Sequence, residues 1–187
     1  MKRQRFFSSR GALFFLSLMF VLTMPLTGHA ATFTVNSTAD AVDAIIGDGI
    51  CQTATAGQCT LRAAIQEANF SAAADEIVLP AGTFTLTLVG AGDDTAATGD
   101  LDIGVNVAST LTIIGQCETL TIIDGNNADR VFETIVNGTV ATIRLVTIRN
   151  GNSAAAGGCI LVSGATTTVT LNDVVVTVCT AVNGVGG

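Results

Sequence analysis

The stretch ATIRLVTI at residues 141–148 recurs as VTLNDVVV at residues 169–176, and we call the offset from 141 to 169 the repeat step. At this offset apolar and β-branched positions of one copy fall on those of the other, and the glycine pair at 157–158 falls one position before the pair at 186–187. Self-similarity at such a period is typical of repeat architectures. Because a single β-rung cannot bury its own apolar face, neighbouring rungs must cover it. The repeat therefore predicts an all-β solenoid of stacked rungs.

Two shorter features extend this prediction over the preceding residues. The pentapeptide TLTII at 110–114 recurs word for word at 119–123, a spacing that suits two neighbouring faces of one coil. Turn-forming pairs punctuate the β-branched runs; they are Asp124-Gly125, Asn137-Gly138, Asn150-Gly151 and Asn183-Gly184. Since no second long helix is visible, parallel pairing must come from coiling of the chain, with rungs about 4.8 Å apart.

One helix is expected, over residues 61–69, with Thr60 as its N-cap and Asn69 as its end. The apolar stripe consists of Leu61, Ala64, Ile65 and Ala68, and the polar side of Arg62, Gln66 and Glu67. Short strands are expected at 31–35, 77–80 and 83–89. An amphipathic helix with one apolar stripe suits a plug for the open end of a solenoid, so we predict that it caps the stack.

The first thirty residues have the form of a secretory signal. A basic start precedes an apolar stretch at 11–26, and small residues precede the expected cleavage site after Ala30. The stretch is interrupted by Ser17 and Pro25 and falls short of the roughly 18 clean apolar residues of a spanning helix. We therefore predict a signal peptide at 1–30, no integral membrane span after its removal, and a secreted or cell-surface location.

After cleavage the chain is strongly acidic. It retains four arginines against fifteen acids, a net charge of −11, and it has no lysine or histidine. Such a surface repels phosphate backbones and anionic lipid, so we expect neither nucleic acid nor a bilayer as a partner. The absence of Trp and Tyr argues against a deep carbohydrate site within this stretch.

The segment CTLRAAIQEAN at 59–69 resembles the signature of the CSLREA domain, a family named for its Cys-Ser-Leu-Arg-Glu-Ala core and found at the start of secreted bacterial proteins. Thr60 in place of Ser keeps a hydroxyl cap, whereas Ala63 in place of Glu loses a charge. The flanking sequences fit as well: FTVN at 33–36, Cys51 ahead of Cys59, and IVLPAGTF at 77–84.

The resemblance implies a module that leads into right-handed parallel β-helix repeats of the pectin-lyase-like kind, which residues 151–187 resemble. It implies no established reaction. The expected organisation is a signal peptide, an N-terminal cap at 31–90, and the first rungs of a β-helix at 91–187. Because the repeat stops in mid-rung at Gly187, we expect further rungs beyond it.

Because the chain is expected to be exported to an oxidising compartment, its cysteines can form disulfides. Cys51 and Cys59 lie close together in the sequence, so a disulfide that staples the Gly-rich loop to the helix start is favoured over two separate buried thiols. Closing this loop should be worth about 2–3 kcal/mol. Cys117, Cys159 and Cys179 leave an odd count among apolar strand residues, and we expect core packing for them rather than metal ligation.

Four carboxylates gather within ten positions, at Asp93, Asp94, Asp100 and Asp102. Asp100 and Asp102 alternate around Leu101 and would share one face of a strand. The simplest interpretation is a solvated acidic loop that runs into a strand. Two alternatives stay open: a Ca²⁺ site at the four aspartates, and an acid–base pair at Asp100 and Asp102. No other cofactor is expected.

The known chemistries of β-helix enzymes find little support. Polygalacturonase-like hydrolases need a Gly-His-Gly element, and the mature chain has no histidine. Arg144 and Arg149 have the spacing of the Arg-x-Pro-x-x-Arg element of pectate-lyase-like enzymes, but Val146 occupies the proline position. An arginine base would also have to lose a proton with a pKa above about 12. We expect ordinary strand alternation with outward arginines, and no catalytic residue here.

We therefore predict a secreted or cell-surface β-helix scaffold that is non-catalytic in this segment. Its expected role is adhesion or contact with extracellular polysaccharide or with a host or cell surface. The alternative is the N-terminal part of a polysaccharide lyase or glycoside hydrolase whose active site lies beyond residue 187.

Overall fold

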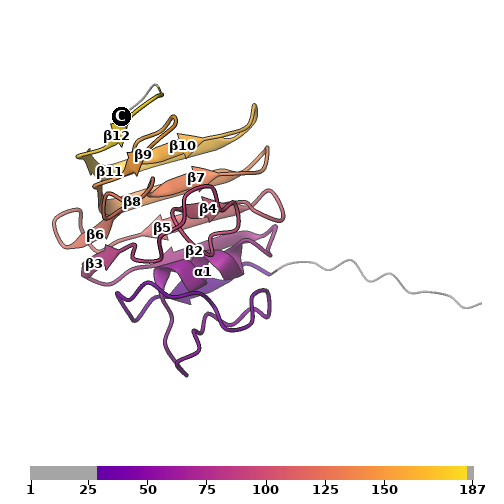
Figure 1. Cartoon of the computed structure of the whole chain (residues 1–187). Helices are drawn as coiled ribbons and strands as arrows, with labels where there is room; N and C mark the ends of the chain where they lie inside the picture. Colours follow the sequence, from indigo (N-terminus) through magenta and orange to yellow (C-terminus); the bar gives the residue numbers. More distant parts are fainter. Residues whose placement is uncertain (1–28, 185–187) are drawn as a thin grey trace, which may run out of the picture.

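The computed structural model describes residues 29–184, and this part of the chain is mostly β (Figure 1). It contains one helix, α1 (Leu61–Ala68). The strands are β1 (Thr32–Thr34), β2 (Ala74–Val78), β3 (Gly82–Thr85), β4 (Leu101–Ile103), β5 (Thr110–Ile114), β6 (Thr121–Asp124), β7 (Phe132–Thr134), β8 (Val140–Arg149), β9 (Asn152–Ser153), β10 (Ile160–Val162), β11 (Thr168–Thr177) and β12 (Thr180–Ala181). The predicted signal peptide, apart from its last two residues, lies outside the described residues.

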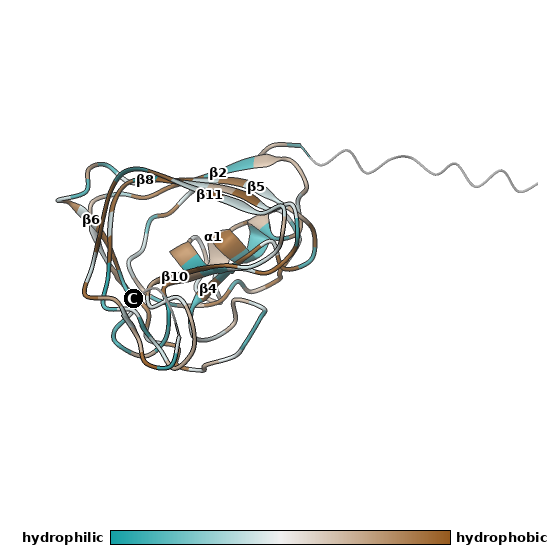
Figure 2. Cartoon of the chain, turned by 90° about the horizontal axis from the view of Figure 1, so that it is seen from above, coloured by the Kyte–Doolittle hydropathy of each residue, from teal (hydrophilic) through white to brown (hydrophobic). Residues whose placement is uncertain are grey.

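Every strand pair in the described part is parallel, and the strands form three sheets. The largest has the order β1-β2-β5-β8-β6-β3, with β11 on β8; the others are β10-β7-β4 and β12-β9. The first half of β8 pairs with β5, and its second half pairs with β6. β5 contains the whole of the first TLTII copy, and β6 contains the end of the second. The large sheet therefore curls: seen along the stack, β2, β5 and β11 lie over one another on one side, and β6 lies on another side (Figure 2).

The predicted repeat step is the register between β8 and β11, where Ala141 pairs with Val169. The same step joins β7 to β10 and β9 to β12. Earlier offsets differ from this step: the offsets from Ala74 to Thr110 and from Thr110 to Val140 are longer, and the offset from Ile122 to Thr147 is shorter. The repeat is therefore regular only in the later part of the described chain, where the sequence shows it.

Backbone corners recur at the repeat step. Leu145 and Asp173 interrupt β8 and β11 at equivalent points with φ of 59° and 53°, and Asn150 and Val178 follow these strands with φ of 55° and 54°. A left-handed backbone costs an ordinary residue roughly 1–2 kcal/mol. Leu145 and Val178 have no preference for that conformation, so the path of the chain imposes these corners and the packing of the strands must offset their cost.

Apolar side chains form columns along the stack. Ile77, Ile113 and Ile143 are register partners in β2, β5 and β8, and Leu101 and Phe132 are partners in β4 and β7. All five are at most 1% exposed. Burying such a side chain is worth about 1.5–3 kcal/mol, so these columns are a main source of stability and fix the register between turns.

The helix α1 begins and ends where the sequence predicts. The Ala63 N–H donates to Oγ1 of the N-cap Thr60 at 3.2 Å, and Asn69 is the C-cap. The helix packs against β2 and β4 and lies towards the N-terminal end of the stack (Figure 1). Viewed along the stack, it lies within the outline of the curled chain (Figure 2).

The polar side of α1 is buried, which its amphipathic pattern does not reveal. Arg62 and Glu67 are only 1% and 3% exposed. The Arg62 guanidinium pairs with Asp40 at 2.6 Å, and the Glu67 carboxylate accepts the N–H groups of Gly47 and Gly49 at 2.7 and 2.6 Å. Loop residues before and after the helix thus cover it, and each charge has the partner that burial demands.

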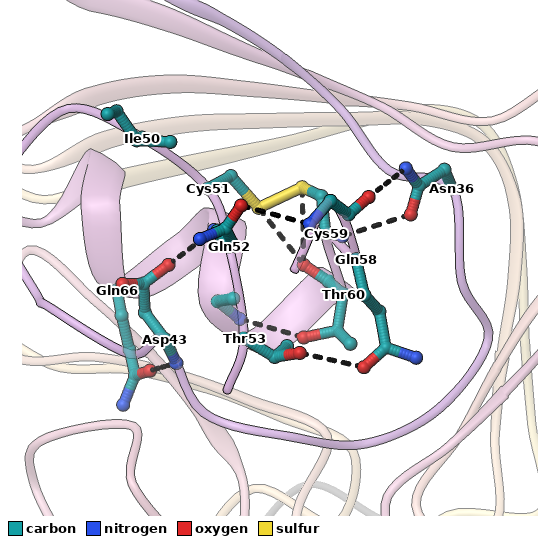
Figure 3. The surroundings of a disulfide bond; sticks show 12 residues. Asn36, Asp43, Ile50, Cys51, Gln52, Thr53, Gln58, Cys59, Thr60 and Gln66 are labelled. Atoms are coloured by element: carbon teal, nitrogen blue, oxygen red, sulfur yellow. Dashed lines mark hydrogen bonds between the residues drawn. A yellow bond between two sulfur atoms is a disulfide. The ribbon is translucent and has the colours of Figure 1, made fainter. Parts of the chain in front are cut away.

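The predicted disulfide between Cys51 and Cys59 is present, with Cα atoms 5.1 Å apart (Figure 3). Beside it, the Cys59 N–H donates to Oδ1 of Asn36 at 2.9 Å. Asp43 accepts the Gln52 N–H at 2.8 Å on the other side. The bridge therefore holds the loop before α1 against the N-cap of the helix.

The sequence leaves open whether the three remaining cysteines pair, and the expected core packing holds for Cys159 and Cys179, which lie in or against the apolar core. Cys159 and Cys179 form a second disulfide, just before β10 and β12. Cys179 follows Gly151 by one repeat step, and a Cβ at Gly151 would approach Sγ of Cys159 to 2.8 Å. Glycine therefore leaves the space in which successive turns are bridged. Cys117 keeps a free thiol.

Asp124, at the end of β6, ties two neighbouring turns together. Its oxygens accept the Asn126 N–H at 2.9 Å, Nε of Arg149 at 2.7 Å, and the side-chain amide of Asn150 at 3.0 Å. Burial acts to raise the pKa of Asp124, but the hydrogen bonds from Asn150, Asn126 and Arg149 together lower it. The ionised carboxylate is thus the form that the fold prefers.

Asp124→Asn is expected to lower the free energy of unfolding by about 1–2 kcal/mol at pH 7. Because folding lowers the pKa of Asp124, its contribution is complete above the unfolded value of about 3.9 and is lost as the pH falls through the lower folded value. Urea unfolding from pH 7 downwards should show the wild type and the variant converging in acid. Asp173→Asn, in an exposed corner, is the matched control; a pH-independent gap for Asp124→Asn would contradict the ionic role.

Candidate functional site

Carboxylates converge where β4 lies beside β7. Asp102 and Glu133 are register partners in these parallel strands and therefore point to the same side of their sheet. Asp94 comes from the preceding loop, and one oxygen of each of these three side chains lies within 4.8 Å of the others. Asp100 lies just before β4. We refer to Asp94, Asp100, Asp102 and Glu133 as the acidic cluster.

One arginine partly balances the acidic cluster. Nε of Arg130 donates to Oδ2 of Asp100 at 2.8 Å, and its terminal nitrogens donate to Glu133 and to Oγ of Ser153. The side chains of Arg130 and Asp100 are only 11% and 1% exposed. With four carboxylates and one guanidinium, the ionised cluster carries an uncompensated negative charge in a partly desolvated place, where charge interactions are strong.

Asp102 is the most deeply buried member, with 0% exposure. Its Oδ2 accepts the Ala96 N–H at 2.7 Å, whereas its Oδ1 is buried without a hydrogen-bond partner. Burial, and after it the neighbouring charge of Asp100, raise the pKa of Asp102 to about 8. Burial also raises the pKa of Asp100 and of Glu133, against the opposing effect of Arg130.

Asp93 has a different role from its predicted companions. Its carboxylate accepts the Thr95 hydroxyl at 2.5 Å and the N–H groups of Ala97 and Thr98 at 2.8 and 2.7 Å. Burial alone would raise the pKa of Asp93, but the hydrogen bonds from Thr95, Thr98 and Ala97 lower it. Asp93 therefore organises the loop that carries Asp94 to the acidic cluster.

The acid–base alternative at Asp100 and Asp102 fits poorly with this geometry. A group that protonates a polymer must come within hydrogen-bond reach of it. Asp100 and Asp102 are 1% and 0% exposed, and Asp100 is already committed to Arg130. Neither carboxyl group can touch an external polysaccharide without rearrangement of the turn.

Glu133 is the member of the cluster that sequence reasoning missed. The offset from Asp102 to its partner Glu133 is slightly longer than the repeat step that joins β8 to β11. Even so, in a parallel stack a carboxylate that lies about one repeat step after an aspartate on a strand indicates that the two side chains lie side by side. The predicted solvated acidic loop is thus accurate for Asp94 and inaccurate for Asp100 and Asp102.

A second acidic group lies beside α1, at Asp43, Asp48 and Glu67. Its buried members are already satisfied: Glu67 accepts two main-chain N–H groups, and Asp43 accepts those of Ile45 and Gln52 at 2.8 Å. Burial raises the pKa of Glu67, against those two hydrogen bonds. These contacts account for the group as loop structure.

A cavity of about 210 Å³ lies beside the C-terminal end of α1. It is lined by Ile46, Gln66, Asn69, Phe70, Thr95, Val105 and Asn106. Pockets for drug-sized ligands occupy roughly 300–1,000 Å³. This cavity is smaller and is mainly apolar, with no charged side chain among its lining residues.

The two arginines that have the pectate-lyase-like spacing make different contacts. Arg144 is exposed, whereas Arg149 donates Nε to Asp124 at 2.7 Å. Arg149 therefore stabilises a turn, and its guanidinium is held in an ion pair.

Comparison of the chain with protein-family models, with curated proteins and with solved structures found no match in any of the three. Within residues 29–184, no helix has both the length and the apolar character that a bilayer crossing requires. The functional conclusion consequently depends on the fold and on the side chains described above.

Proposed function

We propose that this chain is an exported, non-catalytic scaffold, built as a right-handed parallel β-helix with a CSLREA-like cap at its N-terminal end. Residues 31–90 form the cap in this proposal, and residues 91–187 the first pectin-lyase-like rungs. Parallel pairing at the repeat step in three pairs of strands supports the coil. Two disulfides suit an oxidising compartment outside the cytoplasm.

The observation that supports contact with polysaccharide is a column of threonines on the outer side of the large sheet. Thr112, Thr142 and Thr170 are register partners in β5, β8 and β11, and none of them is buried. Parallel strands repeat about every 4.8 Å. The column thus presents hydroxyl groups, each both a donor and an acceptor, in a regular row. Such a shallow polar row suits contact with the hydroxyl groups of an extended polysaccharide.

The test measures binding and turnover on the same exported protein. Binding to pectin, alginate and cellulose is measured by co-sedimentation, and the release of reducing ends or unsaturated products is followed in parallel, with and without calcium. We expect retention on at least one polymer without product. The double variant Thr142→Val/Thr170→Val should weaken retention several-fold, whereas Thr55→Val, at an exposed loop position, should leave it unchanged.

Two results would contradict the proposal. Product release by the chain would favour the alternative, the N-terminal part of a polysaccharide lyase or glycoside hydrolase. Equal retention of the threonine double variant and the loop control would mean that the threonine column does not bind the polymer.

A further inference from the structure

We infer that Asp94, Asp102 and Glu133 form a calcium site that locks the loop before β4 onto the first turns of the stack. This inference is independent of polysaccharide contact, because it concerns a different part of the molecule. It differs from the sequence-based alternative in its ligands: Asp93 and Asp100 are replaced by Glu133.

Geometry supports a single shared ion. One oxygen from each of the three side chains lies within 4.8 Å of the other two. Calcium binds carboxylate oxygens at about 2.3–2.6 Å, so two ligands of one ion can be up to about 5 Å apart. Magnesium, at about 2.0–2.1 Å, needs a tighter set and gives up its water reluctantly. Three carboxylates with water completing the shell on the exposed side of Asp94 therefore suit calcium.

The unpartnered oxygen of Asp102 is the independent sign that something binds here. Asp102 is 0% exposed, and its Oδ1 has no hydrogen-bond partner, although Oδ2 is bound by the Ala96 N–H. A buried, unpaired carboxylate oxygen is costly, and such groups in native proteins call for a partner such as an ion. A cation shared with Glu133 and Asp94 supplies that partner.

Charge around the site points the same way. The groups that face it are the carboxylates of Asp94, Asp102, Glu133 and Asp100, with Arg130 as the one cation held among them in the described part of the chain. The guanidinium is engaged by Asp100 and Glu133 and donates no hydrogen bond to Asp102. A divalent cation would offset the remaining negative charge.

The ion would join three pieces of chain. Asp94 belongs to the loop whose Ala96 and Gly99 carbonyls accept hydrogen bonds from Arg62 of α1, while Asp102 and Glu133 belong to β4 and β7. Calcium binding should therefore stabilise the junction between the helix and the first turns. Loss of the ion should loosen that junction without unfolding the later turns.

The test uses the exported chain after treatment with a chelator. Calorimetric titration should show one Ca²⁺ per chain with a Kd of about 10⁻⁴–10⁻³ M, the range of extracellular modules. At a tenfold excess over Kd, the melting temperature should rise by about 4 °C. Sodium chloride at matched ionic strength separates this rise from general screening of an acidic surface.

Asp102→Asn should abolish calcium binding and the melting shift. Asp94→Asn, at an exposed position, keeps the test decisive if Asp102→Asn does not fold, and it should weaken binding at least tenfold. Asp48→Asn, in the second acidic group, should bind as the wild type does. Unchanged binding in both cluster variants, or no calcium-specific shift in the wild type, overturns the inference.

Discussion

Replacing Arg62 with methionine is expected to lower the free energy of unfolding by about 3–5 kcal/mol, the range found when one partner of a buried ion pair is removed. The Arg62 side chain is fully buried, and its Nε lies 2.6 Å from Oδ1 of Asp40, itself 2% exposed. Its terminal nitrogens donate to the carbonyls of Ala96, Gly99 and Asp100 at 2.8–3.2 Å. Methionine fills part of the volume but supplies no donor, so one carboxylate and three carbonyls lose a partner.

Urea denaturation measures this loss, with the slope m checked for a change in the denatured state. Arg144→Met is the matched control, because Arg144 is exposed, and it should change stability by no more than about 0.5 kcal/mol. A loss below about 1 kcal/mol for Arg62→Met would contradict the view that this guanidinium holds the surrounding loops to α1.

Phe132→Ala is expected to cost about 3–5 kcal/mol, the usual range for truncating a buried phenylalanine. Phe132 lies at the centre of the three-stranded sheet, with Leu101 of β4 and Ile160 of β10 as its register partners. Its exposure is 1%. Alanine would leave a void in the middle of an apolar column, and the flanking strands cannot close it without breaking their register.

Phe70→Ala makes the same chemical change at a position that is 53% exposed, so its cost should be below about 1 kcal/mol. Thermal unfolding of both variants at equal protein concentration gives the comparison. Similar losses at the two positions would mean that the β4-β7-β10 column is not a core, which would contradict the stacking described here.

Much of the fold in the later part of the described chain is predictable from the sequence, because the repeat step alone sets which residues pair. One repeat step brings Ala141 beside Val169, and apolar partners in the two copies then stack without further information. The helix is equally local, since Thr60 and Asn69 mark its ends through short-range hydrogen bonds. The longer offsets of the earlier turns, from Ala74 to Thr110 and from there to Val140, carry no sequence repeat and could not be predicted.

Features that depend on contacts across turns escape the sequence. The Cys159–Cys179 bridge forms because Gly151, one step before Cys179, leaves room beside Cys159. The left-handed corner at Leu145 has no sequence signal, because leucine does not favour that conformation. Burial of Arg62 depends on Asp40 in the preceding loop and on carbonyls that lie well beyond the helix.

The candidate site shows the same division. Two members of the calcium site, Asp94 and Asp102, lie in the acidic run that the sequence singles out. The third, Glu133, is brought in by the pairing of β4 with β7. Asp93 and Asp100 resemble ligands in sequence, but hydrogen bonds and an ion pair commit them to other tasks. A run of carboxylates therefore predicted the neighbourhood of the acidic cluster and only part of its composition.

The most direct test of the parallel stack is a map of methyl–methyl nuclear Overhauser effects in the labelled chain. Parallel stacking predicts contacts between Ile113 and Ile143 and between Ile143 and Leu171, which are register partners in neighbouring parallel strands. An antiparallel sandwich would instead give contacts in which one residue number rises as the other falls. Observation of that second pattern, with no contact between Ile143 and Leu171, would contradict the stack of parallel turns.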